Sequence, residues 1–276
     1  MANHLQYVVE NSTPVSRKVN VLLQSFFNRD ALPSDLRRDT LQLLPTAVRL
    51  LHVGSPKQND TQGMVNVCST NTWLKPAIAA IELCQMVVQG QWNEDSRLLQ
   101  LPHFDKDRAA AFDGEGVSSI FDFLDMEDAA RAKLLEGLSE REIEDVVQFC
   151  DAYPDIEVNA ALEGGEVCCG QDAVLNVQLN AGEEGETYST EVRSENYPQK
   201  LRQTWWLILG DPTDSSIQSI VEVDLERSRS KQLAFTAPEK PGHYSWMLYF
   251  MTDAYIGCDQ EQEIEFDVVE TKWIVC

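Results

Sequence analysis

Histidine and aspartate are common carriers of proton transfer and metal binding, and this sequence places three of them together. His103 lies two residues from Asp105 and four from Asp107, the nearest approach in the chain to a metal or acid–base cluster. Alternate positions at the start of a helix point to different faces, so these side chains are not expected to converge. The sequence also lacks a Gly-x-x-x-x-Gly-Lys-Ser/Thr phosphate loop and a Gly-x-Ser-x-Gly nucleophile elbow. We therefore expect no catalysis by this chain, no cofactor and no bound metal.

Seven cysteines, an odd number, offer a second kind of chemistry. They stand at positions 68, 84, 150, 168, 169, 258 and 276, and none forms a Cys-x-x-Cys pair. The adjacent residues Cys168 and Cys169 are poorly placed for a disulfide or a zinc site. Free thiols in a reducing compartment are the prediction, with Cys84 as a small core residue of an apolar helix.

The charge of the chain argues against nucleic acid as a ligand, and its lack of long apolar stretches argues against a membrane. Its 276 residues carry 22 basic and 45 acidic side chains, a net charge of −23. Residues 1–100 carry +1, residues 101–155 carry −10 and residues 156–276 carry −14. An acidic surface repels phosphate backbones, and no stretch reaches the roughly 18 apolar residues of a membrane helix. We expect weak or no direct nucleic-acid binding, no membrane contact, and protein partners instead.

The first hundred residues have the hydrophobic periodicity of helices. Predicted helices cover residues 15–28, residues 34–51 with a kink at Pro45, and the long segment 73–92 with Thr72 as its cap. The long helix is apolar on most of its surface, which is typical of a central helix in a bundle. Its polar residues form one stripe: Lys75, Glu82, Gln85 and Gln89.

Residues 101–154 contain four shorter helical pieces. The first two flank a Gly-containing turn at residues 113–117, an arrangement that suggests a helix-hairpin-helix. Such units often present backbone N–H groups to phosphate, with Lys or Arg nearby. Here Asp113 and Glu115 flank the turn, so packing and orientation are the expected role.

From Asp155 onward the hydrophobic period changes to two, which predicts strands. Seven short strands within about 115 residues are typical of an immunoglobulin-like sandwich. Neighbouring strand residues point to opposite faces, so one of Trp205 and Trp206 should be core and the other a surface for a partner. The strand candidates are 156–158, 174–179, 205–209, 217–223, 231–236, 244–251 and 263–269.

These segments together predict a multi-domain α + β protein. Its first unit is a helical bundle over residues 1–100, and its second is a helix-hairpin-helix domain over 101–154. The third is an immunoglobulin-like (fibronectin-type) seven-stranded β-sandwich over 155–270. Three units agree with the usual size of about 100–150 residues per domain.

Several strings, which cover nearly all of residues 15–270, resemble a known module. They are Leu22-Leu-Gln, Trp73-Leu-Lys-Pro-Ala-Ile-Ala-Ala-Ile-Glu-Leu, Gln100-Leu-Pro-His-Phe104, Gly116-Val-Ser-Ser-Ile-Phe-Asp122, Phe149-Cys-Asp-Ala-Tyr-Pro154, Trp205-Trp206, Gly210-Asp211 and Leu248-Tyr-Phe-Met-Thr-Asp-Ala-Tyr-Ile-Gly-Cys-Asp-Gln-Glu261. The chain resembles the Sec63 homology module that closes a helicase cassette in Ski2-like helicases. It is most similar to the C-terminal cassette of the spliceosomal member of that family, the RNA helicase of the U5 snRNP.

The resemblance implies that the motor domains lie upstream and that this chain is a C-terminal fragment without them. It also implies that residues 73–92 act as a ratchet helix along a nucleic-acid tunnel, with Lys75, Glu82, Gln85 and Gln89 as its lining. With one cation, Lys75, and one anion, Glu82, this lining would attract a phosphate backbone only weakly. That departure fits a second cassette, which in the family is a regulatory and protein-binding platform.

The leading interpretation is therefore a non-catalytic module of a pre-mRNA splicing ATP-dependent RNA helicase. It would be nuclear, support the upstream motor domains and bind spliceosomal proteins. One alternative is a nucleic-acid-contacting ratchet module, which would need a basic face. Another is the cytosolic module of the endoplasmic reticulum translocon protein, which should show membrane spans and a J-domain His-Pro-Asp. A different Ski2-like helicase also stays open.

Overall fold

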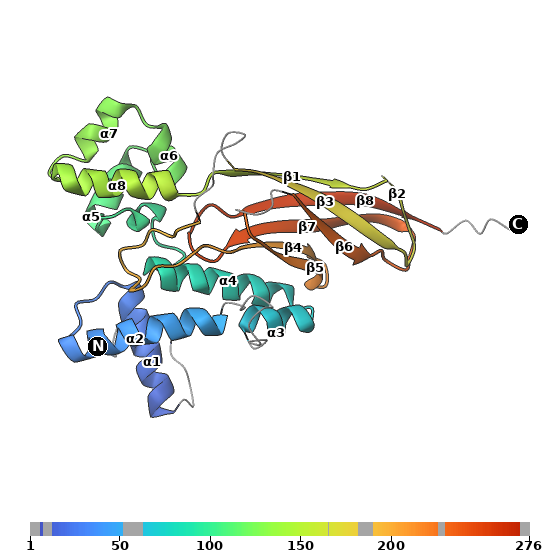
Figure 1. The fold of residues 1–276 in the computed structure, drawn as a ribbon, viewed down its shortest axis with the longest axis horizontal. Helices are drawn as coiled ribbons and strands as arrows, with labels where there is room; N and C mark the ends of the chain where they lie inside the picture. Colours follow the sequence, from blue (N-terminus) through green and yellow to red (C-terminus); the bar gives the residue numbers. More distant parts are fainter. Residues whose placement is uncertain are drawn as a thin grey trace, which may run out of the picture.

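The computed structural model divides into a helical half and a β half (Figure 1). It describes residues 6–7, 13–51, 63–164, 166–181, 190–225 and 230–270. Among these residues every helix ends by Ala152 and every strand begins at or after Ile156. The change of hydrophobic period near residue 155 therefore marks the true boundary between helix and strand.

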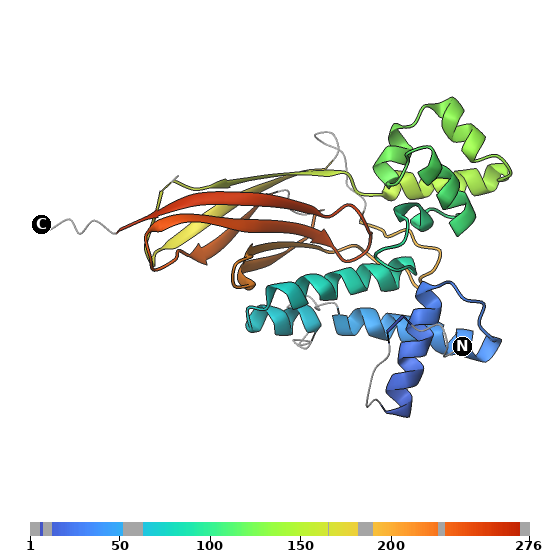
Figure 2. The same ribbon diagram turned by 180° about the vertical axis from the view of Figure 1, so that it is seen from behind.

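Three helices surround a fourth in the first hundred residues. α1 (Pro14–Phe27), α2 (Ser34–Leu51) and α3 (Met64–Thr70) all contact α4 (Leu74–Gln89). The Thr13 side chain caps α1 by accepting from the Ser16 N–H, and Pro45 lies inside α2. In both views α4 lies between the other three helices and the β half (Figures 1 and 2).

Helix α4 is shorter than the predicted segment 73–92. It stops at Gln89 because Gly90 takes the left-handed conformation, with φ of 65°, that ends many helices. The prediction that Thr72 caps the helix is wrong. Trp73 holds the cap position without a side-chain hydrogen bond, and the Thr72 hydroxyl donates to the Asn71 carbonyl at 2.7 Å.

Five short helices follow α4. They are the 3-10 helix η2 (Arg97–Gln100) and the α-helices α5 (Lys106–Gly114), α6 (Ile120–Asp125), α7 (Asp128–Leu134) and α8 (Glu140–Ala152). Ser119 with Asp122 and Ser139 with Glu142 form capping boxes at the starts of α6 and α8. These reciprocal hydrogen bonds explain why such short helices begin where they do.

The described strands form two sheets. A three-stranded antiparallel sheet has the order β1 (Ile156–Leu162), β3 (Asp172–Ala181), β6 (Ser230–Thr236). A five-stranded sheet has the order β2 (Glu166–Cys168), β8 (Gln260–Val269), β7 (Gly242–Thr252), β4 (Trp205–Asp211), β5 (Ser216–Val223). Seven of the eight strands lie where the period-two pattern predicted them. Strand β2 was not predicted, because it is only three residues long; it pairs parallel with β8.

The two halves are not independent. Trp73 and Ser216 form an isolated antiparallel bridge, in which Leu74 N–H donates to the Ser215 carbonyl at 3.0 Å. A side chain at Gly210 would place its Cβ 2.5 Å from a Leu74 methyl carbon, so this glycine permits the close approach of α4 to β4. One hydrophobic cluster runs from Phe27 in α1 to Val268 in β8. The sheets therefore share a core with the helices.

Candidate functional site

The four polar residues of α4 lie in different surroundings. Lys75 is exposed and Glu82 is half-buried, whereas Gln85 and Gln89 are each 1% exposed. The two glutamines face the segment 252–259, which joins β7 to β8. The expectation that Gln85 and Gln89 line an open channel is wrong, because both side-chain amides are used inside the chain. For Lys75 and Glu82 the lining role stays a prediction.

Hydrogen bonds from these amides hold the β7–β8 segment against α4. Gln85 Nε2 donates to the Thr252 carbonyl and to Asp259 Oδ2, both at 2.7 Å. Gln89 Nε2 donates to the Ala254 carbonyl at 2.6 Å. The second carboxylate oxygen of Asp259 accepts from the Thr252 N–H at 2.9 Å. Irregular backbone can be buried only when its polar groups have partners, and α4 supplies those partners here.

Asp259 is the ionisable group at the centre of this contact. Burial raises the pKa of its carboxyl to about 7, against the hydrogen bonds from Gln85 and the Thr252 N–H, which lower it. Glu82 raises this pKa further and Arg97 lowers it. The contact between α4 and the β half therefore contains a group that titrates near neutral pH.

Residues from the middle of the chain hold the same segment from another side. Gln100 makes a reciprocal pair with Ile256, since its Nε2 donates to the Ile256 carbonyl and its Oε1 accepts from the Ile256 N–H, each at 2.8 Å. The Tyr153 hydroxyl donates to the same Ile256 carbonyl at 3.1 Å. Segment 252–259 is thus the point where α4, η2, the end of α8 and the sheet meet.

The last backbone carbonyls of α4 accept hydrogen bonds from side chains of the segment 193–197. Ser194 Oγ donates to the Val88 carbonyl at 2.6 Å, and Asn196 Nδ2 donates to the Gln89 carbonyl at 2.9 Å. The last carbonyls of a helix lack partners within the helix, so these contacts complete the helix end. Both halves of α4 are therefore bonded to the β half.

Arg29, just after α1, was missed by the sequence analysis. Its Nε donates to the Gly90 carbonyl and its Nη1 to the Phe104 carbonyl, both at 3.2 Å, and its Nη2 bonds the Leu99 carbonyl. Burial lowers the pKa of this guanidinium. A single arginine in a polar loop carries no signal in the sequence that distinguishes it from a solvated one.

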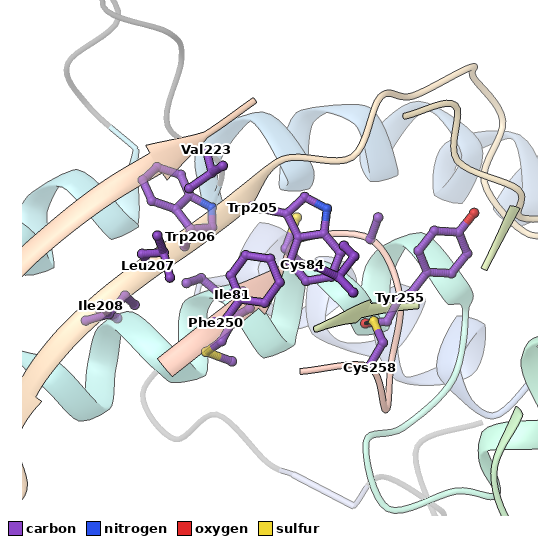
Figure 3. Packing of buried hydrophobic residues seen from close by; sticks show 14 of the residues in the cluster. Ile81, Cys84, Trp205, Trp206, Leu207, Ile208, Val223, Phe250, Tyr255 and Cys258 are labelled. Atoms are coloured by element: carbon purple, nitrogen blue, oxygen red, sulfur yellow. Dashed lines mark hydrogen bonds between the residues drawn. The ribbon is translucent and has the colours of Figure 1, made fainter. Parts of the chain in front are cut away.

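The prediction that one of Trp205 and Trp206 forms a partner surface is wrong, because they are 1% and 5% exposed. All six residues from Trp205 to Gly210 are buried. Strand β4 lies inside its sheet, with α4 against one face and the second sheet behind the other, so the two-residue alternation does not separate core from surface. Figure 3 shows Trp205 over Phe250, whose rings stack at 4.3 Å, with Ile81 and Cys84 of α4 close by.

Two of the described cysteines, Cys84 and Cys258, have deeply buried thiols. All six are free, as expected, and Cys84 is a core residue. Burial raises the pKa of the Cys84 and Cys258 thiols well above the ordinary value, which keeps both protonated and unreactive at neutral pH. Figure 3 shows both thiols among apolar side chains.

His103 has acidic partners, but not Asp105 and Asp107. Its Nε2 lies 2.8 Å from Asp145 Oδ2 in α8 and 3.5 Å from Glu195 Oε1 in the β half. Donor atoms of these three residues all lie within 4.8 Å of one another. Direct pairing of the imidazole with the carboxylates accounts for the arrangement, which links α8 to the segment around residue 195.

The two charged residues of the polar stripe on α4 have opposite signs. Lys75 is exposed in the first turn of α4, and Trp73, at the cap position of the helix, is 51% exposed. The half-buried Glu82 opposes this charge further along the helix. In the part of the chain that the structure describes, no helix is long and apolar enough to span a bilayer.

Comparisons with known proteins decide the family. The family described as "Sec63 Brl domain" matches residues 1–265. The chain belongs to the Sec63 Brl domain family. This match bears out the resemblance seen in the sequence strings, and it covers both the helices and the sheets of the junction.

Curated relatives of this Sec63 domain include helicases. The "DExH-box ATP-dependent RNA helicase DExH12" of Arabidopsis thaliana is 39% identical over 274 residues, 97% of this chain and 12% of the helicase. The "U5 small nuclear ribonucleoprotein 200 kDa helicase" of Mus musculus is 40% identical over 256 residues, 92% of this chain and 11% of that protein. The "Activating signal cointegrator 1 complex subunit 3-like" protein of Dictyostelium discoideum is 34% identical over 276 residues, 96% of this chain and 12% of that protein. The chain spans about one-eighth of these relatives.

Proposed function

We propose that this chain is a non-catalytic module of a pre-mRNA splicing ATP-dependent RNA helicase of the U5 snRNP. It supports the motor domains of its parent chain and binds spliceosomal proteins in the nucleus. The names of its relatives support this assignment, since two of them are DExH12 and the U5 snRNP 200 kDa helicase. The proposal includes a division into a helical bundle (1–100), a helix-hairpin-helix domain (101–154) and an immunoglobulin-like sandwich (155–270).

The observation that carries the proposal is the internal use of α4. A helix that tracked a nucleic acid with its polar stripe would keep that stripe free, but Gln85 and Gln89 bond Thr252, Asp259 and Ala254 of the same chain. These buried bonds make α4 a strut that fixes the sheets relative to the helices. We therefore infer that the helix α4 has a supporting role within the chain.

Three observations support a role without catalysis. The sequence has no phosphate loop. Burial keeps the thiols of Cys84 and Cys258 protonated, and His103 is engaged with Asp145 and Glu195. The residues 101–276 also carry a strongly negative charge, which favours encounter with basic protein surfaces over RNA.

Nucleic-acid contact is the second candidate function, and one observation favours it. Trp73 and Lys75 are both exposed at the start of α4. An exposed aromatic ring can stack on a base of a single strand, and an exposed cation can contact a phosphate. One such pair supplies a single phosphate contact, which makes this contact secondary to protein binding.

The test is capture of partners from nuclear extract on the immobilised chain, with and without ribonuclease treatment, followed by mass spectrometry. The proposal predicts enrichment of U5 snRNP proteins that survives ribonuclease. Capture that ribonuclease abolishes would favour the nucleic-acid module instead. Enrichment of endoplasmic reticulum membrane proteins would support the translocon module.

A further inference from the structure

An apolar groove lies between α6, α7 and α8. Figures 1 and 2 show these three helices at the end of the molecule opposite to the C-terminal end of β8. It encloses about 400 Å³. Apolar side chains make its floor, and two carboxylates and one guanidinium also line it. The apolar lining consists of Phe123, Leu124, Ala132, Leu135, Ile143, Val146, Val147 and Cys150.

Helix α7 is incompletely packed within this chain. It buries none of its side chains, in contrast to α5, α6 and α8 on either side of it. Leu124 is 39% and Val147 50% exposed, so large apolar groups of the groove face water. Most amphipathic helices gain their stability by burying an apolar face. A partner that fills the groove would bury Leu124 and Val147.

The surroundings of the groove are acidic. Residues 118–152 carry ten acidic and three basic side chains. Asp128 and Asp151 line the groove itself. The guanidinium of Arg131, the cation in the lining, is already engaged by Asp128 and by the carbonyls of Phe123 and Leu124, the latter two at 3.2 and 3.1 Å. The charge available to a ligand is therefore negative.

We propose that this groove binds a basic amphipathic helix of a partner protein. The inference rests on the proposed function as a protein-binding module and names the chemistry of one partner. A groove between helices that has an apolar floor and a charged rim is the usual receptor for a helix with apolar anchors three and four residues apart. Its volume accommodates one or two large apolar side chains, and Lys or Arg residues beside them would meet Asp151 and the acidic residues around the groove. RNA fits poorly, because the floor offers no cation and the rim repels phosphate.

The test uses a fluorescein-labelled 14-residue peptide of Leu and Lys, with Leu at helical spacing, titrated into the chain and followed by fluorescence anisotropy. The decisive variant is Val147→Asp. Val147 is half exposed, so the variant should fold. The matched control is Val67→Asp in α3, which adds the same charge at a residue that is 44% exposed and lies outside the groove. Circular dichroism checks that both variants keep the fold.

Groove binding and simple charge attraction predict opposite results. If the groove binds the peptide, Val147→Asp weakens binding at least about tenfold, because an apolar anchor loses its contact, and Val67→Asp does not weaken it. If only charge attracts the peptide, both variants bind it equally well or slightly more tightly, and the proposal is overturned. No binding at a peptide concentration of about 50 µM would also overturn the proposal. Capture of U5 snRNP proteins from nuclear extract does not depend on the peptide result. Failure of this inference is therefore distinguishable from failure of the proposed function.

Discussion

Replacing Gln85 by leucine should destabilise the protein strongly although the volume hardly changes. The substitution leaves the buried Thr252 carbonyl without its donor, at a cost of about 1–3 kcal/mol. It also removes the donor to Asp259 Oδ2, and a hydrogen bond to a charged group contributes about 1.5–3 kcal/mol. We expect a loss of about 3–5 kcal/mol in the free energy of unfolding. Lys75→Ala on the exposed face of the same helix should change it by less than about 0.5 kcal/mol.

The pH dependence of this loss identifies its cause. The folded-state pKa of Asp259, about 7, lies above the ordinary aspartate value of about 3.9. The stability that this group contributes is therefore fully present below about pH 4 and is lost as the pH rises to about 7. Gln85 lowers that pKa, so its removal raises the pKa and penalises the ionised form further. Gln85→Leu should therefore cost more at pH 8 than at pH 5, by about 1–2 kcal/mol.

Urea unfolding followed by circular dichroism at pH 5 and pH 8 measures both quantities for the wild type, Gln85→Leu and Lys75→Ala. A midpoint for Gln85→Leu that matches the control at both pH values would refute the buried contact. A large loss that is equal at both pH values would show that the Thr252 carbonyl matters and the Asp259 carboxylate does not.

Three further outcomes follow from single features of the fold. Gly90→Ala should lower the free energy of unfolding by about 1–2 kcal/mol because of the left-handed φ of 65°, and by as much again because the new Cβ would lie 2.7 Å from Asn196 Cβ. Gly137→Ala has a φ of 92° and no atom within 4 Å of the new Cβ, so it should show only the first of these two losses in the same urea assay. Iodoacetamide at pH 8, mapped by mass spectrometry, should leave Cys84 and Cys258 unmodified until urea is added, and rapid native labelling of either would contradict their burial. The purified chain should hydrolyse no ATP with or without RNA, and steady turnover that survives repeated chromatography would disprove this.

Local patterns in the sequence predicted the secondary structure well. The change of period at residue 155 reflects which residues face a core along one element, so it is visible without any long-range contact. The capping box of Ser139 and Glu142 lies within four residues, so it too is a local feature of the sequence. Strand β2 gave no signal because three residues are too few to show alternation.

The surroundings of the candidate residues could not be predicted in this way. The polar stripe on α4 identifies one face of the helix, but Gln85 meets Thr252 from 167 residues away, and no local pattern encodes that contact. The prediction that one of Trp205 and Trp206 is exposed was wrong for a related reason. Alternation distinguishes core from surface only where one face of a sheet is wet, and β4 is covered on both faces.

We propose that the polar face of α4 supports the β half and does not contact RNA. The most direct test is a titration of fluorescein-labelled single-stranded RNA with the chain, followed by anisotropy at about 50 mM salt, where the Debye length is still above ~10 Å and electrostatic attraction is weakly screened. The account predicts no binding in the micromolar range, and no difference between the wild type and Lys75→Glu. Micromolar or tighter binding that Lys75→Glu abolishes would contradict it, and would make α4 an RNA contact.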